Sequence, residues 1–147
     1  MFKNILVPTD GSKLSHKAVK EAIELAKKTD AKVTALHVYP KFAGSPYGTF
    51  GPAEDILEEA HKNQERAEGD SLFAGIRKLT EAAGVPLDAV LVESNDVWKQ
   101  IITTARKKKC DVICMASHGR RGIAGVLLGS ETHKVLTHSE LPVLVLR

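Results

Sequence analysis

Short apolar runs alternate along this chain with segments in which hydrophobic residues recur at helical spacing. The runs are almost continuous in valine, isoleucine and leucine, which is typical of strands covered on both faces in a parallel sheet. They predict five strands, at residues 5–8, 33–39, 89–93, 112–116 and 142–146. The helical spacing predicts four helices, at residues 13–28, 53–82, 97–109 and 131–138.

The expected helices carry different start and stop signals. Ser12 or Ser15 is placed to cap the first helix. The second is long, and Gly69 interrupts or frames it before Gly84 and Pro86 end it. Its apolar positions include Ile56, Leu57, Leu72, Phe73, Ile76 and Leu79. The preceding segment, 40–52, contains three glycines and three prolines and is expected to be a loop.

Strands that alternate with helices predict an α/β domain built on a parallel sheet. In open sheets of this kind, ligands bind beyond the carboxyl ends of the strands, where the winding of the chain reverses. The loops of interest are therefore residues 9–12, the stretch after Val38, and residues 117–129.

Composition narrows the class of protein. The 147 residues, 43% hydrophobic and 27% charged, predict a single globular domain over 1–147. A net charge of +3 with no long basic run argues against a nucleic-acid partner. The chain contains neither an apolar stretch of membrane-spanning length nor a signal-peptide pattern, so we expect no membrane association and a cytoplasmic location. Cys110 and Cys114 lack metal or redox spacing and are expected to be buried, reduced thiols.

The segment after the fourth expected strand, "ASHGRRGIAGVLLGS", is rich in glycine and basic residues. Glycines after a strand, followed by a serine at a helix start, favour anion binding by backbone amides, with Ser130 as cap or phosphate contact. A purely structural loop is the alternative, and the residues alone leave both open. The segment is neither a Walker A loop nor a GxGxxG turn.

Asp10, in the turn after the first strand, also has two interpretations. Its carboxylate could cap the first helix, or it could approach a ribose hydroxyl or a phosphate-bound metal ion. His37, within an apolar strand, is interpreted as a hydrogen-bonded core residue. No GxSxG nucleophile elbow or other catalytic constellation is evident, so we expect no fast enzyme.

Four stretches together resemble the universal stress protein family over essentially the whole chain: "ILVPTDGS", "LHVYP", "ASHGRRGIAGVLLGS" and "LPVLVLR". The third matches the family's nucleotide signature of Gly, two residues, Gly, nine residues, Gly, then Ser or Thr. Here Gly119, Gly129 and Ser130 keep the last positions, while Ala116 replaces the first glycine. Because alanine adds only a methyl group, we expect weakened or retained binding.

The resemblance implies a three-layer, Rossmann-like α/β/α fold, similar to adenine nucleotide alpha hydrolases, with strand order 3-2-1-4-5. It implies ATP as ligand, with Mg²⁺ carried by the phosphates and no dedicated metal site. Asp10 would lie at the ribose and phosphates, and Pro8 and the backbone of Val38 at the adenine. The other expected binding residues are Thr9, Ala116, Ser117, His118, Gly119, Arg120, Arg121, Gly122, Gly129, Ser130, Glu131 and Thr132. A phosphate contact by either arginine is our inference from its charge.

The last apolar run closes the chain with no helix after it, which favours an edge strand able to pair with another chain. The resemblance points the same way, to a homodimer joined through this strand. We therefore expect a cytoplasmic, dimeric, ATP-binding stress-response sensor or regulator that hydrolyses ATP slowly or not at all. The alternative is a nucleotide-free interaction module of the same fold, marked by Ala116 and contacting partners through the 40–52 loop.

Overall fold

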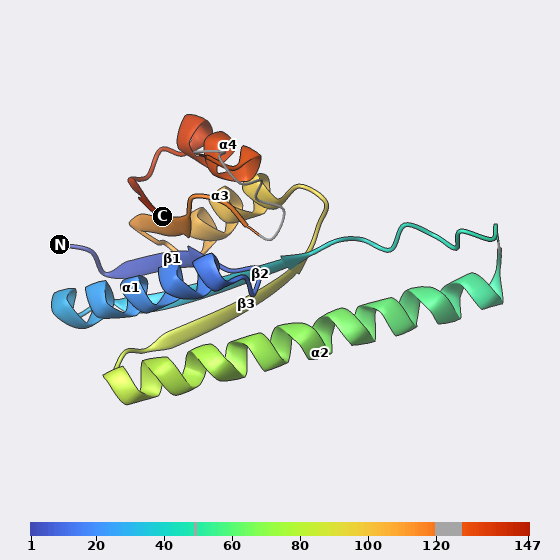
Figure 1. The fold of residues 1–147 in the computed structure, drawn as a ribbon, viewed down its shortest axis with the longest axis horizontal. Coiled ribbons are helices and arrows are strands. Elements are labelled where there is room, and N and C mark those ends of the chain that lie inside the picture. The colour runs from blue at the N-terminus through green and yellow to red at the C-terminus, as the bar shows by residue number, and fades with distance from the viewer. Residues whose placement is uncertain (49, 120–127) are drawn as a thin grey trace.

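The computed structural model contains a five-stranded parallel sheet with helices on both faces (Figure 1). It describes residues 1–48, 50–119 and 128–147. The strands are β1 (Asn4–Pro8), β2 (Lys32–Tyr39), β3 (Leu87–Glu93), β4 (Val112–Ala116) and β5 (Val143–Leu146). Their order across the sheet is β3-β2-β1-β4-β5, and every pairing is parallel. The expected fold class and strand order are confirmed.

Four helices cover the sheet in the described part of the chain: α1 (Lys13–Thr29), α2 (Pro52–Ala83), α3 (Val97–Lys107) and α4 (Ser130–His138). Residues of α1 and α2 share one apolar cluster with the sheet, and residues of α3 and α4 share another. The two pairs therefore lie on opposite faces, which gives three layers. Among the described helices, none combines the length and apolar character needed to cross a membrane.

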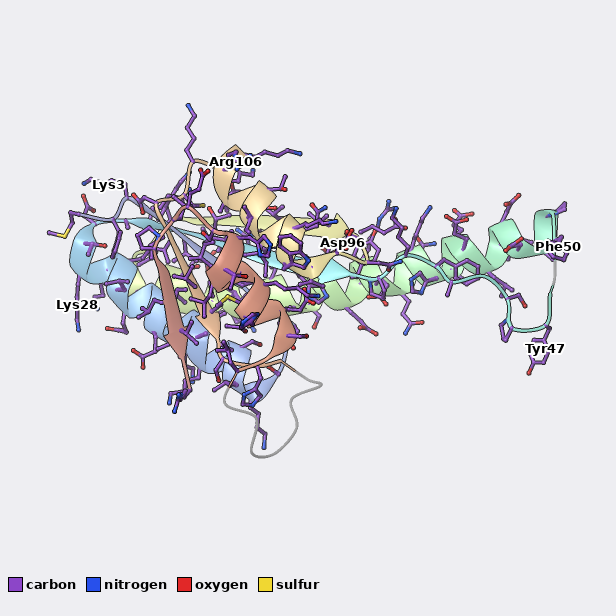
Figure 2. All side chains as sticks on the ribbon, turned by 90° about the horizontal axis from the view of Figure 1, so that it is seen from above. Lys3, Lys28, Tyr47, Phe50, Asp96 and Arg106 are labelled. Atoms are coloured by element: carbon purple, nitrogen blue, oxygen red, sulfur yellow. The ribbon has the colours of Figure 1, made fainter. Side chains whose placement is uncertain are left out.

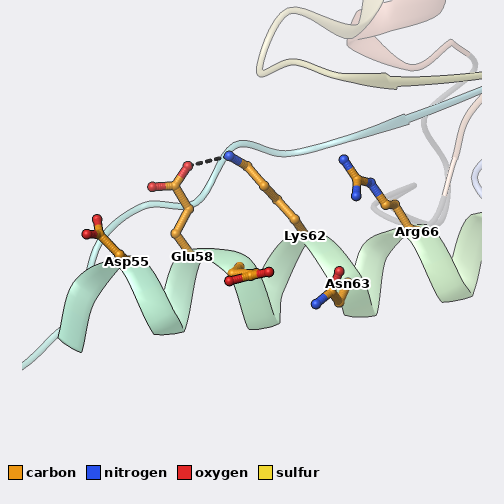
Figure 3. A pocket seen from close by; sticks show the side chains of 6 residues that line it. Asp55, Glu58, Lys62, Asn63 and Arg66 are labelled. Carbon is orange, nitrogen blue, oxygen red and sulfur yellow. Dashed lines mark hydrogen bonds and ion pairs between the residues drawn. The ribbon is translucent and has the colours of Figure 1, made fainter. Parts of the chain in front are cut away.

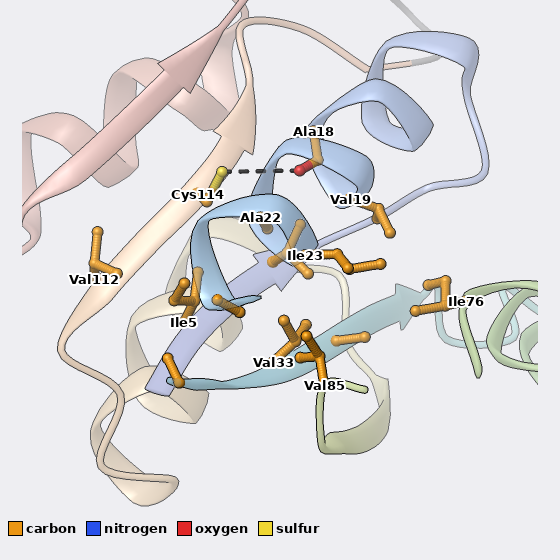
Figure 4. Packing of buried hydrophobic residues seen from close by; sticks show 14 of the residues in the cluster. Ile5, Ala18, Val19, Ala22, Ile23, Val33, Ile76, Val85, Val112 and Cys114 are labelled. Atoms are coloured by element: carbon orange, nitrogen blue, oxygen red, sulfur yellow. Dashed lines mark hydrogen bonds between the residues drawn. The ribbon is translucent and has the colours of Figure 1, made fainter. Parts of the chain in front are cut away.

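Each central strand contributes side chains to both apolar clusters. In β1, Ile5 and Val7 pack beneath α1 while Leu6 packs on the α3 side. In β4, Cys114 faces α1 and Ile113 faces α3. Figure 4 shows the α1 side, where the alanine-rich face of α1 lies over these strands. Burial on both faces explains why these runs are apolar without interruption.

The first helix begins as its sequence indicates. The hydroxyl of Ser12 accepts a hydrogen bond from the Ser15 amide at 3.1 Å, which satisfies one of the free amides of the first turn. The predicted ends of other helices need small corrections. The third helix ends at Lys107 rather than at 109, because Lys109 has a left-handed backbone with φ of 53°.

The long helix α2 differs most from expectation. It runs without a break through Gly69, which is buried where the helix crosses the sheet. A Cβ added at Gly69 would lie 2.8 Å from Cδ1 of Leu91, so the glycine permits a close approach of α2 to β3. Ahead of this point the helix extends past the sheet (Figure 1), and Ile56 and Leu57 are 68% and 43% exposed. These two apolar positions of the helix are therefore not part of the core.

We call this projecting part the arm, formed by residues 40–48 and 52–67. The expected loop after β2 accounts for the first segment, which runs outward from the sheet to the tip of the arm, and α2 returns beside it (Figure 1). Both cysteines are buried free thiols, as predicted. Cys114 Sγ donates to the carbonyl of Ala18 at 3.8 Å, and burial raises the pKa of this thiol to about 11.

Two glycines of α2 provide a test of its geometry. Gly75 lies on the exposed face with no described atom within 4 Å of an added Cβ, whereas Gly84 ends the helix with φ of 68°. We expect Gly75→Ala to raise the free energy of unfolding by about 0.5–1 kcal/mol, because alanine favours the helix. Gly84→Ala should lower it by about 1 kcal/mol, because a Cβ disfavours that backbone. Urea denaturation of both variants measures this, and equal signs would contradict it.

Cys114 predicts a pH dependence of stability. The thiol of an unfolded chain has a pKa of about 8.5, below the value of about 11 in the native protein. Between these values only the unfolded chain releases the proton, so the stabilisation is complete below about pH 8.5 and is lost as pH rises toward about 11. We expect the wild type to lose about 3 kcal/mol more over this interval than Cys114→Ala. Parallel curves for the two proteins in denaturant titrations would rule this out.

Candidate functional site

The loops that follow β1 and β4 meet at the centre of the sheet. The two strands are neighbours, with Ile5 paired to Val112 and Leu6 to Ile113. After β1 the chain enters α1 on one face, and α4 follows β4 on the opposite face. The winding therefore reverses between these strands, which is where open α/β sheets bind their ligands.

Thr9, the first residue after β1, is buried and bonded on several sides. Its amide donates to the carbonyl of Leu36 at 2.8 Å, and its hydroxyl lies 3.1 Å from that of Ser15. Its carbonyl oxygen lies 2.8 Å from Nδ1 of His37, which must donate to it. These bonds confirm His37 as a hydrogen-bonded residue of the fold and fix the end of β1.

Asp10 shapes the turn that follows. Its Oδ1 accepts a hydrogen bond from the amide of Ser12 at 2.9 Å, and Gly11 between them has φ of 77°. Ser12, not Asp10, is the N-cap of α1. The capping interpretation of Asp10 is therefore wrong, because its side chain closes the turn one step before the helix. Gly11 and the buried Ser15 were not singled out from the sequence as site residues, although "DGS" is a turn signal.

Ser117 connects the end of β4 to two other elements. Its amide donates to the carbonyl of Leu146 in β5 at 2.7 Å, and its own carbonyl accepts from the amide of Gly129 at 2.7 Å. In the first turn of α4, the hydroxyl of Thr132 donates to the carbonyl of Ala116 at 3.0 Å. The start of α4 is thereby held directly against the end of β4.

Two glycines of this loop have no room for a side chain. A Cβ on Gly119 would collide with Oδ2 of Asp10, which brings the β4 loop into contact with the β1 loop. A Cβ on Gly129 would lie 3.2 Å from both the Ser117 carbonyl oxygen and Cα of His118. Gly129 has an ordinary φ of −70°, so it is space rather than backbone conformation that requires glycine there.

The N-terminus of α4 differs from those of α1 and α3. Ser12 caps α1, and Oε2 of Glu131 accepts from the Trp98 amide at 2.8 Å in the first turn of α3. The N-cap of α4 is Gly129, with no side-chain capping bond. Ser130 was predicted as a cap but is the first helical residue. Like α2, whose N-cap is Gly51, α4 has no side-chain cap from the described residues, and an uncapped helix start with its positive dipole end favours an anion.

The structure brings together most of the residues expected to bind the ligand. Val38 lies half-buried on the neighbouring strand β2, two residues beyond the partner of Pro8. The side chains of Glu131 and Thr132 are engaged by α3 and β4. The predictions for Arg120, Arg121 and Gly122 fall outside the described residues. The following residues lie in the loops at the carboxyl ends of β1 and β4 and in the first turn of α4, where open sheets have their binding crevice: Pro8, Thr9, Asp10, Ala116, Ser117, His118, Gly119, Gly129, Ser130, Glu131 and Thr132.

The side chains of the crevice do not form a metal cage. Among the described residues, no group of three or more histidine, cysteine, aspartate or glutamate side chains is placed to hold an ion. Glycines and the first turn of α4 lie here instead, and the backbone amides of a helix start are suited to anionic oxygen atoms.

Comparison with known proteins identifies a family and several relatives of this chain. The model of the universal stress protein family matches residues 1–147. Universal stress protein MJ0531 of Methanocaldococcus jannaschii is 34% identical, over all of this chain and 83% of its own length. Universal stress protein YxiE of Bacillus subtilis is 30% identical over the full length of both chains.

Solved structures of similar proteins share this architecture. The structure of MJ0577 superposes with a TM-score of 0.84 at 29% identity, covering 99% of this chain and 96% of the other. A universal stress protein in complex with cAMP gives 0.70 at 22% identity over 99% and 97% of the two chains. One from Archaeoglobus fulgidus in complex with dAMP gives 0.65 at 19% over 99% and 98%, so both share the fold. With its sheet order, its glycine-lined loop and a family match over its whole length, this chain belongs to the universal stress protein family.

Proposed function

We propose that this protein binds ATP in the crevice between β1 and β4 and acts as a cytoplasmic stress-response sensor or regulator. The observation that carries this proposal is the N-terminus of α4, which begins at Gly129 without a side-chain cap beside the end of β4. Phosphate oxygens are the ligands that such a helix end favours most. Mg²⁺ would come with the nucleotide and screen the charge of its phosphates.

Each part of the nucleotide has candidate partners. The phosphates would lie against the amides of Ser130 and the residues that follow, and against residues 117–119 after β4. Asp10, whose carboxylate contacts the backbone position of Gly119, would accept a hydrogen bond from a ribose hydroxyl. The adenine would lie beyond Pro8 and the backbone of Val38.

Ala116 does not argue against this fit. Its methyl group belongs to the apolar cluster beneath α1, and the residue is only 8% exposed. The additional carbon is accommodated within the core on that side of the sheet, which supports retained binding. The family members crystallised with cAMP and dAMP support an adenine nucleotide as the class of ligand.

Hydrolysis should be slow. Among the described residues, Asp10 and His118 are the titratable side chains of the loops after β1 and β4, and both bond to neighbouring residues: Asp10 to the Ser12 amide, and His118 Nδ1 to the Ser117 hydroxyl at 3.2 Å. A general base must be directed at the attacking water, and neither group has that arrangement here. We therefore propose a binding protein that is at most a weak ATPase.

Ser130→Asp tests the site because its effects on binding and on stability should have opposite signs. A carboxylate in the first turn of α4 stabilises the helix dipole, yet it repels the phosphates. We expect at least about tenfold weaker binding of Mg·ATP by calorimetry, which is about 1.4 kcal/mol, with thermal stability unchanged or raised. Ala53→Asp, which adds the same charge to the first turn of α2, is the control and should bind ATP normally. Wild-type affinity in Ser130→Asp would refute the site.

Ala116→Gly separates ATP binding from the nucleotide-free alternative. If the methyl group is accommodated in the core, removing it should change affinity by less than about tenfold and slightly lower stability. Undetectable binding in the wild type with clear binding in Ala116→Gly would instead identify an interaction module that has lost its ligand.

We also propose a homodimer joined through β5. This strand is at the edge of the sheet, where it pairs with β4 and leaves its other side for a second chain. Leu144 on this strand is 42% exposed although it is a large apolar residue. An edge strand with an exposed leucine is suited to pairing with a copy of itself across a two-fold axis.

Leu144→Arg should therefore halve the mass of the assembly measured by light scattering at micromolar concentration. A charged side chain on an edge strand opposes pairing with another sheet while leaving the fold intact. Leu136→Arg is a matched control, since Leu136 is 41% exposed on α4. The idea fails if Leu144→Arg retains the wild-type mass.

A further inference from the structure

The outer side of the arm carries an apolar stripe. Ala53, Ile56, Ala60 and Ala67 are three, four and seven positions apart, so they lie along one face of α2, with Leu57 beside them. All five are exposed. Figure 2 shows the arm extending far from the sheet, with Tyr47 and Phe50 near its tip. A helix face with this spacing is typical of one that packs against another helix.

The inner side of the arm is already occupied by its own loop. Nε2 of His61 lies 3.0 Å from the carbonyl oxygen of Pro40, and the ring of His61 is 5.7 Å from that of Phe42. The Lys41 amide also donates to the side chain of Asn95 at 3.0 Å. These contacts hold residues 40–42 against α2 and the main body of the protein, so the stripe on the opposite side of the helix remains open.

Charge is divided along one flank of the stripe. Acidic residues come first and basic residues later, and together they border a shallow groove (Figure 3). The groove is lined by Asp55, Glu58, Glu59, Lys62, Asn63 and Arg66. Lys62 Nζ pairs with Glu58 at 2.6 Å, which raises the pKa of the lysine.

The other charges of this flank are poorly arranged for an isolated helix. Asp55 and Glu59 are like charges four residues apart, as are Lys62 and Arg66, and such pairs destabilise a helix. Within the described part of the chain, neither Glu59 nor Arg66 takes part in an ion pair. An antiparallel helix of the same sequence would bring its basic half against this acidic half, and the reverse.

We propose that the outer face of the arm binds the arm of a second copy of this protein, with the two α2 helices antiparallel. A two-fold axis between positions 61 and 62 places Ile56 against Ala67 of the partner subunit. The same axis places Glu59 beside the partner's Arg66 on the flank, and each contact occurs twice because the interface is symmetric. The small alanines let the helices approach closely, and the larger Ile56 and Leu57 fill the seam.

A second copy fits this surface better than an unrelated protein would. The charge division is complementary to its own reversed copy, and the same two-fold axis sets Ile56 against Ala67 of the partner subunit. The interface is also independent of β5. The arm projects past the carboxyl end of β2 (Figure 1), which lies next to the edge strand β3, whereas β5 forms the other edge of the sheet. Both contacts can therefore form together, and arm pairing would join two strand-linked dimers into a larger assembly.

Charge reversal on the full-length protein tests the pairing by sedimentation velocity over a range of concentrations. Glu59→Arg and Arg66→Glu should each weaken arm association by about tenfold or more, because each sets like charges together at two places. The double variant, with both residues exchanged, should recover the wild-type mass because it restores opposite charges. Glu81→Arg is the control, since it places the same change on an exposed position of α2 beyond the arm.

The proposal is supported if the single variants form an assembly of half the wild-type mass and the double variant restores it. It is overturned if the single variants keep the wild-type mass, or if the double variant remains small with a native circular dichroism spectrum. Repeating the series with Leu144→Arg separates the two interfaces. A protein that still pairs through its arm then sediments as a dimer, whether or not the β5 contact exists in the wild type.

Discussion

The parallel pairing of β1 with β4 at the centre of the sheet is the constraint on which the rest of the structure depends. Both strands are covered on both faces, and both end at the same edge. The chain moves from β1 to β2 on one side and from β4 to β5 on the other. Because parallel crossovers are long and right-handed, the helices of these two connections lie on opposite faces of the sheet. The result is a crevice whose two walls are the loops after β1 and β4, with no additional element needed to form it.

The walls of this crevice are held mainly by backbone hydrogen bonds. Thr9 is fixed by Leu36 and His37, and Ser117 by Leu146 and Gly129. Because backbone carbonyls and amides hold the loops, the most important residues are two glycines, which have no side chain. Gly119 lets one loop reach Asp10, and Gly129 lets α4 begin directly beside β4.

The helix α2 differs from the other described helices in its length of 32 residues. The sheet covers only the part of the helix from Gly69 onward, and the remainder must be supported by its own loop through contacts such as that of His61 with Pro40. An amphipathic helix that projects past its sheet has one face left without partners in the same chain. The candidate site is formed by the connections after β1 and β4, and the arm by the connection between β2 and β3.

The sequence alone determined the elements of this protein and much of its site. Runs such as that of β1 are apolar at every position because both faces are buried, so the strands and the parallel sheet could be recognised. The spacing of Gly119, Gly129 and Ser130 identified the loop, and the family resemblance supplied the strand order. These features depend on local pattern or on motif spacing, which the chain carries directly.

The exposure of apolar helix positions, the choice of capping residue and the partners of site residues depend on contacts between distant segments. Only the tertiary structure decided these features. Ile56 and Leu57 have helical spacing like Phe73 and Ile76, yet they are exposed because the sheet ends before them. Asp10 and Ser12 are both good capping residues, and the backbone turn at Gly11 selected the second. Glu131 follows the nucleotide motif and was expected to bind the ligand, but its carboxylate accepts a hydrogen bond from the Trp98 amide of α3. Periodicity specifies which face of an element is apolar, whereas packing determines whether anything lies against that face.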